Sequence, residues 1–170
     1  MTNQAQPISQ RGFSLIEALI VIAIIAILGA LAIPFFGGFL ANRNLKSAAR
    51  SIAGDIFELK ERAIAEDRVY QITFNLGANN YVLTQCNDTA LPCNGTVIAT
   101  KSPAAFQNGI TINALNPVGG TVIQIQPRGT INPPGNANES ITLANGRGSK
   151  ATITISLTGR ASVDWTGTMQ

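Results

Sequence analysis

Hydrophobic residues are concentrated in one long run near the start of the chain. No charged residue occurs at positions 18–41, and Ile, Val, Leu and Ala supply most of this segment. A helix of this length extends about 36 Å, which is enough to cross the roughly 30 Å core of a bilayer. Gly29 and Pro34 interrupt the run, but membrane helices tolerate both residue types. The pattern therefore predicts a membrane-spanning helix at residues 13–41.

Between residues 42 and 68 the hydrophobic residues recur at helical spacing. Charged residues of both signs, Asp55 among them, fall between them, so we expect the helix to continue in water with a charged outer face. Glu58 and Glu61 resemble an acid–base pair, but a solvated helix face explains them more simply. The apolar stripe on which we expect a second domain to pack comprises Leu45, Ala49, Ile52, Ile56, Leu59 and Ala63.

After residue 68 the pattern changes to short alternating segments separated by Gly, Pro and Asn. Residues 69–76 and 81–85 flank a turn, as in a β-hairpin. Further strands are predicted at residues 96–100, 110–114, 121–126, 140–144, 151–157 and 160–165. About eight short strands over residues 69–170 indicate an antiparallel domain of two sheets. The predicted fold class is therefore α+β, a long N-terminal helix packed on a C-terminal antiparallel β domain.

Composition narrows the possible functions. The 170 residues carry a net charge of +3, which is too small to indicate nucleic-acid binding by itself. The chain has no histidine, so it lacks the commonest general base and metal ligand. No nucleophile elbow, phosphate-binding loop or cluster of metal ligands is visible. We therefore predict that the protein is not an enzyme and needs no cofactor or metal.

The two cysteines, Cys86 and Cys93, are close in sequence. Two thiolates without further ligands fall short of a zinc site. An oxidising compartment would allow them to form a disulfide that closes a short loop. We predict this disulfide.

A polar segment precedes the apolar run and ends in RGFSLIE, residues 11–17. This motif, the long apolar helix after it and Pro34 resemble the type IV pilin and pseudopilin superfamily over residues 7–41. The resemblance implies that residues 1–12 are a leader peptide, which a prepilin peptidase removes by cleaving between Gly12 and Phe13. It also implies N-methylation of Phe13 and assembly with other pilins or pseudopilins through the helix.

Two interpretations of Glu17 are open. A carboxylate within a membrane run usually has a partner, and the resemblance implies that Glu17 pairs with the new amine of Phe13 on a neighbouring subunit and sets the axial register. Alternatively, Glu17 lies at the level of the lipid head groups and pairs with nothing. Pro34 also has two interpretations, a simple helix kink or, by the resemblance, a kink that lets the helix melt locally on assembly.

The charges around the apolar run conflict with the leader motif. Arg11 is the only basic residue before the run, whereas Arg43, Lys46 and Arg50 follow it. The positive-inside rule would place the C-terminal side in the cytoplasm. The leader motif implies the opposite, because its peptidase acts on cytoplasmic leaders. We give the motif more weight and predict a single-pass protein of the bacterial inner membrane with its β domain in the periplasm.

After the apolar run the chain contains the motifs SAAR at residues 47–50, KERAIA at 60–65, QPRGT at 126–130 and ITISLTGR at 153–160. These motifs resemble the H-type minor pseudopilins and the FimT-like minor pilins, over residues 45–74 and 121–163. This resemblance implies a structural subunit near the tip of a type II secretion pseudopilus, which supports protein export. The alternative is a FimT-like minor type IV pilin that contributes to pilus assembly or to DNA uptake. The cations for such a DNA site are Arg128, Arg147, Lys150 and Arg160. Ordinary surface residues explain these few cations more simply, so DNA is a possible but not a favoured partner.

Overall fold

The computed structural model describes residues 14–116, 122–132 and 138–166, and it leaves out the side chains of residues 32–36. The chain divides into two compact units, residues 1–37 and 38–170, which are described separately below. Helix α1 (Leu15–Glu66) begins in the first unit and ends in the second. The described part of the second unit adds a single turn of 3-10 helix (Pro103–Ala105) and nine strands.

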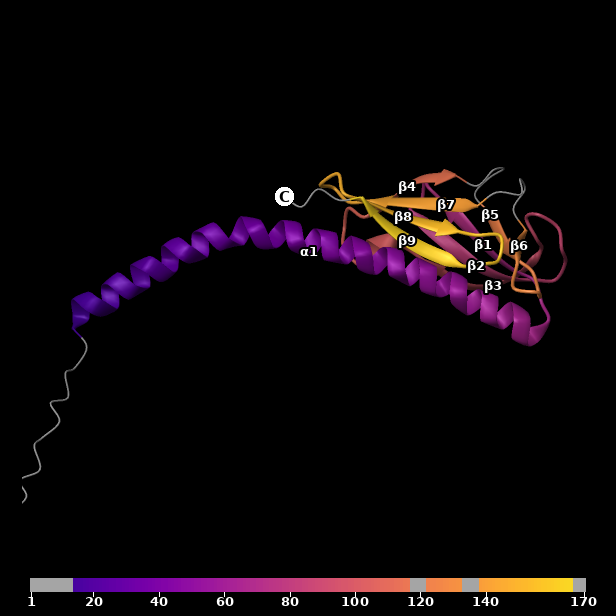
Figure 1. Cartoon of the computed structure of the whole chain (residues 1–170), viewed down its shortest axis with the longest axis horizontal. Helices are drawn as coiled ribbons and strands as arrows, with labels where there is room; N and C mark the ends of the chain where they lie inside the picture. Colours follow the sequence, from indigo (N-terminus) through magenta and orange to yellow (C-terminus); the bar gives the residue numbers. More distant parts are fainter. Residues whose placement is uncertain (1–13, 117–121, 133–137, 167–170) are drawn as a thin grey trace, which may run out of the picture. The chain divides into compact units, whose positions relative to one another are not determined.

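The strands form two antiparallel sheets, coloured magenta to orange and orange to yellow in Figure 1. The five-stranded sheet has the order β3-β2-β1-β5-β6, and the four-stranded sheet has the order β4-β7-β8-β9. The strands are β1 (Tyr70–Asn75), β2 (Asn80–Cys86), β3 (Gly95–Lys101), β4 (Thr111–Asn116), β5 (Val122–Ile125), β6 (Ile131–Asn132), β7 (Glu139–Ala144), β8 (Lys150–Ile155) and β9 (Ala161–Thr166). The predicted α+β fold class is confirmed.

The eight strands predicted from alternation are all present, and β6 is the additional one. It has only two residues, Ile131 and Asn132, which pair with β5. Two residues followed by a Pro-Pro pair cannot show an alternating pattern, so this strand left no signal in the sequence.

Three hairpin turns share one backbone geometry. The turns at residues 126–130, 145–149 and 156–160 join β5 to β6, β7 to β8 and β8 to β9, and in each the first residue bonds to the fifth. The fourth residue is Gly129, Gly148 or Gly159, with φ of +75°, +82° and +72° respectively. This left-handed conformation favours glycine and matches the three-residue hairpin with a glycine bulge. The glycines of these three segments therefore mark hairpin turns.

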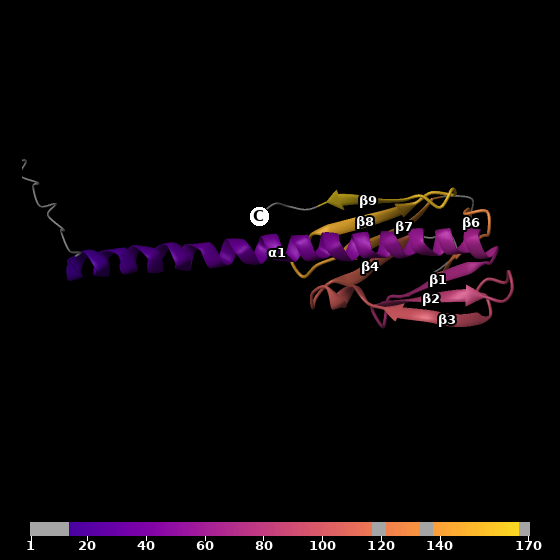
Figure 2. The ribbon, with the colours of Figure 1, turned by 90° about the horizontal axis from the view of Figure 1, so that it is seen from below.

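The hydrophobic core lies between the second part of α1 and the inner faces of both sheets. Seen from below, this part of α1 runs along the domain, with β8 and β9 to one side of it and β1, β2 and β3 to the other (Figure 2). All six predicted stripe residues of α1 are buried, and Ala41 and Ala48 extend the stripe. The sheets contribute alternating residues such as Ile72 and Phe74 from β1 and Ile153 and Ile155 from β8. The predicted packing of an amphipathic helix on a β domain is thus confirmed.

Candidate functional site

The residues predicted to act in processing and assembly belong to the first unit. Gly12 and Phe13 lie outside the described residues. Glu17 lies in the first turn of α1 and is exposed to solvent. Pro34 lies at a helical position of α1, and its side chain is among those left out. The large apolar side chains between residues 15 and 31 each expose 46–83% of their surface. Among the described residues, no helix combines the length and hydropathy that crossing a membrane requires.

Asp55 corrects one prediction. We expected it on the charged outer face of the helix, but it is only 6% exposed and lies within the apolar stripe. Tyr81 donates a 2.7 Å hydrogen bond to Asp55 Oδ2, and Lys101 Nζ lies 2.7 Å from Oδ1. Burial, followed by the hydrogen bond to Asp55, raises the pKa of Tyr81 well above its usual value. Asp55 therefore links α1 to two strands of the five-stranded sheet.

Cys86 and Cys93 form a disulfide, with a Cα–Cα distance of 5.6 Å. Between them the chain folds as a loop, in which Asp88 accepts hydrogen bonds from the backbone of Ala90 and Asn94. Two buried glutamines attach this loop to the outer face of the five-stranded sheet. Gln71 accepts a bond from the Cys93 N–H at 2.8 Å, and Gln124 donates one to the Ala90 carbonyl at 2.9 Å. The loop therefore covers the polar face of β1 and β5.

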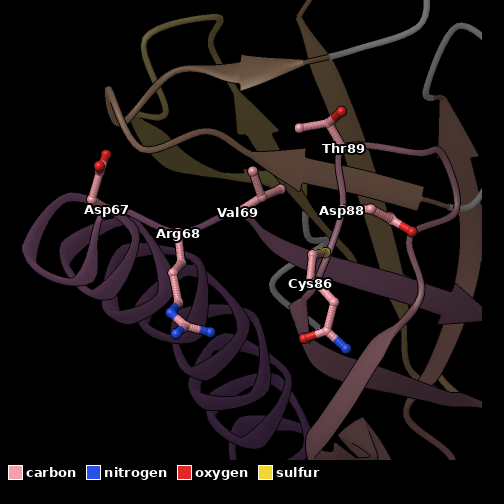
Figure 3. A pocket seen from close by; sticks show the side chains of 7 residues that line it. Asp67, Arg68, Val69, Cys86, Asp88 and Thr89 are labelled. Carbon is pink, nitrogen blue, oxygen red and sulfur yellow. The ribbon is translucent and has the colours of Figure 1, made fainter.

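A hollow of about 410 Å³ lies between the end of α1 and the start of this loop. Figure 3 shows Asp67 and Arg68 at its helix side, pointing in different directions, and Asp88 and Thr89 at its loop side. Within the described part of the chain, no group of three or more His, Cys, Asp or Glu is arranged to hold a metal ion. The charged groups around this hollow do not converge on one point, and we assign it no chemistry.

The four cations proposed for DNA binding lie in two separate pairs. Arg147 and Lys150 lie at the start of β8, in and just after the turn at residues 145–149. Arg160 is the last residue of the turn at residues 156–160, beyond the other end of β8. A six-residue strand extends about 17 Å. Arg128 belongs with Arg160, because its neighbour Gly129 packs against Gly159. The structure therefore does not bring the four residues into one patch.

Lys60 of α1 contacts both turns that carry Arg128 and Arg160, the turns at residues 126–130 and 156–160. Its ammonium donates a 2.9 Å hydrogen bond to the carbonyl of Thr158, and its alkyl chain lies over the two glycines. The Ile131 N–H also bonds to the Leu157 carbonyl, which joins β6 of one sheet to the turn of the other. This end of the domain is therefore closed by α1 and by two turns from different sheets.

At the other end of the domain, α1 meets β9. Lys46 Nζ lies 4.5 Å from the centre of the Trp165 ring, and Asn145 donates a 3.1 Å hydrogen bond to Asn42. Phe39, Arg43 and these α1 residues border a hollow of about 280 Å³ beside Trp165. Lys46 and Trp165 lie on elements far apart in the chain, so no local pattern in the sequence indicates that they pair.

Glu139 is a second buried acid that the sequence did not reveal. It is 1% exposed at the start of β7, on the same face as Ile141 and Leu143, and neither carboxyl oxygen has a hydrogen-bond partner among the described residues. Burial raises the pKa of Glu139 to about 7. From the sequence alone, Glu139 looks like a polar residue just outside a strand. In the structure it belongs to β7 and pairs with Ile155, whose side chain faces the core.

Residues 8–33 match the model of the prokaryotic N-terminal methylation motif. Two fimbrial proteins from Pseudomonas aeruginosa are each 38% identical over 76 residues, which cover 39% of this chain and 49% of theirs. The chain thus spans about half the length of these curated relatives.

Two solved structures have a similar fold over most of this chain. The type IV minor pilin FimU from Pseudomonas aeruginosa (strain PAO1) aligns with a TM-score of 0.56 and 12% identity, over 78% of this chain and 99% of FimU. The minor pseudopilin EpsH from the type II secretion system of Vibrio cholerae aligns with a TM-score of 0.55 and 12% identity, over 75% of this chain and 97% of EpsH. The predicted resemblance to the type IV pilin and pseudopilin superfamily is confirmed. At this level of identity, FimU and EpsH share the pilin fold with this chain, and the methylation motif supplies the sequence signature.

Proposed function

We propose that the protein is a structural subunit of a pilin-like filament, held in the bacterial inner membrane by residues 13–41 before assembly. The observation that carries this proposal is the methylation motif at residues 8–33, joined in one chain to a fold like those of FimU and EpsH. The apolar side chains at residues 15–31 also leave a large uncovered surface, which neighbouring helices or lipid would bury. The β domain then lies in the periplasm.

Processing follows from the same proposal. A prepilin peptidase cleaves between Gly12 and Phe13, and Phe13 receives a methyl group on its new amine. The test is intact mass spectrometry of the protein from its native cell, which should show a chain that begins at Phe13 with one added methyl group. Gly12→Val should block cleavage, because a side chain at that position would occupy the peptidase site, while Gln10→Ala should be processed normally. Wild-type protein that retains residues 1–12 would contradict the proposal.

We infer a position near the tip of a type II secretion pseudopilus, where the subunit supports protein export. The likeness to EpsH supports this system. A minor type IV pilin is the second candidate, which the likeness to FimU and to two fimbrial proteins favours. Deletion of the gene separates the two, since loss of secreted protein with normal surface pili supports the first and the reverse supports the second.

DNA binding is a weaker variant of the second candidate, because the four cations are divided between two ends of β8. Of the two pairs of cations, Arg128 with Arg160 is the better candidate for binding DNA, because Lys60 lies next to the turns that carry them. A gel-shift assay with the whole chain in detergent tests it at low salt, where phosphate contacts are strongest. If DNA binds, Arg128→Gln with Arg160→Gln should reduce the affinity and Arg147→Gln with Lys150→Gln should not. No shift at low salt would exclude this variant.

A further inference from the structure

The hollow beside Trp165 combines aromatic walls with positive charge. Phe39 is 67% exposed, Trp165 is half-buried, and the Lys46 ammonium lies over the indole ring. Arg43 stands one turn before Lys46 on the same side of α1, and Asn42 adds an amide. A ligand in this hollow would meet two cations, two rings and no carboxylate among the lining residues.

The positive charge extends beyond the hollow. Arg50 continues the line of exposed cations along α1, and no acid occurs in residues 18–54. The bond between Asn145 and Asn42 brings the turn that carries Arg147 to this end. Lys150 pairs with Thr166, so its side chain lies on the sheet face opposite Trp165 and is not part of this group. Asp164 is the neighbouring acid, but alternation along β9 directs its side chain to the face opposite Trp165. This end of the domain therefore offers four exposed cations to an anionic surface, namely Arg43, Lys46, Arg50 and Arg147.

The position of these residues in the chain indicates what that surface is. The cations begin two residues after the uncharged segment at residues 18–41 ends. Basic residues next to a membrane segment attract anionic lipids, and tryptophan favours the interface between lipid and water. A single strand of DNA would instead require several aromatic residues in a row for stacking. Phe39 and Trp165 flank one hollow and form no such row.

We propose that the hollow beside Trp165, with Arg43 and Lys46, binds the head groups of anionic phospholipids in the membrane that holds the protein. This proposal rests on the membrane-held state proposed above and adds a contact between the β domain and the bilayer surface. The contact would be lost when the subunit leaves the bilayer for the filament. It also gives the cations after the apolar run a role on the periplasmic side, where the positive-inside rule does not expect them.

The test uses Trp165, the one tryptophan of the chain, as its probe. The full chain is reconstituted in nanodiscs of phosphatidylcholine alone or with phosphatidylglycerol, and both contain the same amount of head-group spin label. Phosphatidylglycerol should shift the Trp165 emission to shorter wavelength and increase quenching by about twofold or more. Arg43→Gln with Lys46→Gln should abolish this increase, because two charges next to the lipid are worth about tenfold or more in affinity. Each variant is compared with its own signal in phosphatidylcholine, since Lys46 itself affects the indole.

The matched control is Arg128→Gln with Arg160→Gln, which removes the same charge from the other end of the domain and should behave as wild type. Equal quenching in both lipids, or an unchanged response in the Arg43 and Lys46 variant, would overturn the proposal. The same emission change on adding inorganic phosphate or an oligonucleotide to phosphatidylcholine discs would overturn it too, since the site would then not be specific for lipid. Failure of the chain to enter nanodiscs at all would instead contradict the membrane-held state itself.

Discussion

Asp55 and Tyr81 join the helix to the five-stranded sheet through a buried hydrogen bond of 2.7 Å. Asp55 is 6% exposed and Tyr81 is 2% exposed, so water does not compete strongly for either group. Lys101 reaches the second oxygen of Asp55 from the edge strand β3. The carboxylate is thus shared between a neutral donor and a cation, which offsets the free-energy cost of burying it. Asp55 is thus a buried polar contact between α1 and the sheet within an otherwise apolar stripe.

Asp55→Ala should lower the free energy of unfolding by about 2–4 kcal/mol, because it leaves the Tyr81 hydroxyl buried without its acceptor and removes the partner of Lys101. Urea denaturation monitored by circular dichroism measures the change as a lower midpoint at unchanged slope. Glu58→Ala is the control, since Glu58 pairs with Arg62 on the exposed face and should cost no more than about 0.5 kcal/mol. Equal costs for the two variants would show that the buried contact has no special weight.

Gly159→Ala should destabilise the protein by roughly 2–4 kcal/mol. A Cβ there would contact the carbonyl oxygen of Gly129 and approach Lys60 Cδ to 3.1 Å, so backbone would have to move. Its φ of +72° adds strain for any residue with a side chain. Gly148→Ala isolates that strain, because its φ is +82° but, apart from its chain neighbours, no described residue places an atom within 4 Å of the new Cβ. Thermal unfolding should therefore rank Gly148→Ala, at about 1 kcal/mol, well below Gly159→Ala.

Oxidation of Cys86 and Cys93 should reduce the intact mass of the purified protein by two hydrogens. Replacing both cysteines by serine should lower the free energy of unfolding by about 2–3 kcal/mol in the chain-entropy model, since the closed loop is short. Urea denaturation with and without reductant provides the measurement. Reductant should destabilise the wild type and leave the serine variant unchanged. Two free thiols in protein exported to the periplasm would contradict the prediction.

Most of the fold could be predicted from local patterns in the sequence. The stripe on α1 and the alternation in the strands were visible because each depends on residues three, four or two positions apart. The glycine turns were equally visible, since a positive φ at Gly148 and Gly159 restricts those positions to few residue types. These signals needed no knowledge of distant contacts.

The contacts that define the candidate sites depend on distant residues and were not visible. Asp55 was assigned to the outer face by its charge, although its spacing from Ile52 and Leu59 puts it within the stripe. A buried acid needs a partner, and the sequence does not show that Tyr81 and Lys101 supply one. The position of Arg128 beside Arg160 likewise depends on a contact between turns of different sheets, Gly129 against Gly159, and not on spacing along the chain.

Glu139 should make the stability of the protein depend on pH. Its pKa of about 7 in the folded protein lies above the ordinary 4.5, so the native state binds the proton more tightly than the unfolded state. The stabilisation is complete below about pH 4.5 and is lost as the pH rises through about 7. Relative to Glu139→Gln, the wild type should lose about 1–3 kcal/mol across this range, measured by urea denaturation at several pH values. The exposed Glu61→Gln should show the dependence of the wild type, and an identical dependence in the Glu139 variant would contradict the assignment.

Glu17 should determine whether the subunit enters a filament. Its carboxylate is exposed in the first turn of α1, in a segment whose large apolar side chains are also uncovered. A charge in an apolar environment needs a counter-charge, which the amine of Phe13 on a neighbouring subunit would provide after processing. Glu17→Gln should therefore reduce recovery of the protein in sheared filaments by about tenfold or more, given that a paired charge is worth a few kcal/mol there, while cleavage proceeds normally. Ser14→Ala, a change in the same turn without loss of charge, should assemble as wild type. Full incorporation of the Glu17 variant would leave the alternative, that Glu17 sits at the level of the head groups and pairs with nothing.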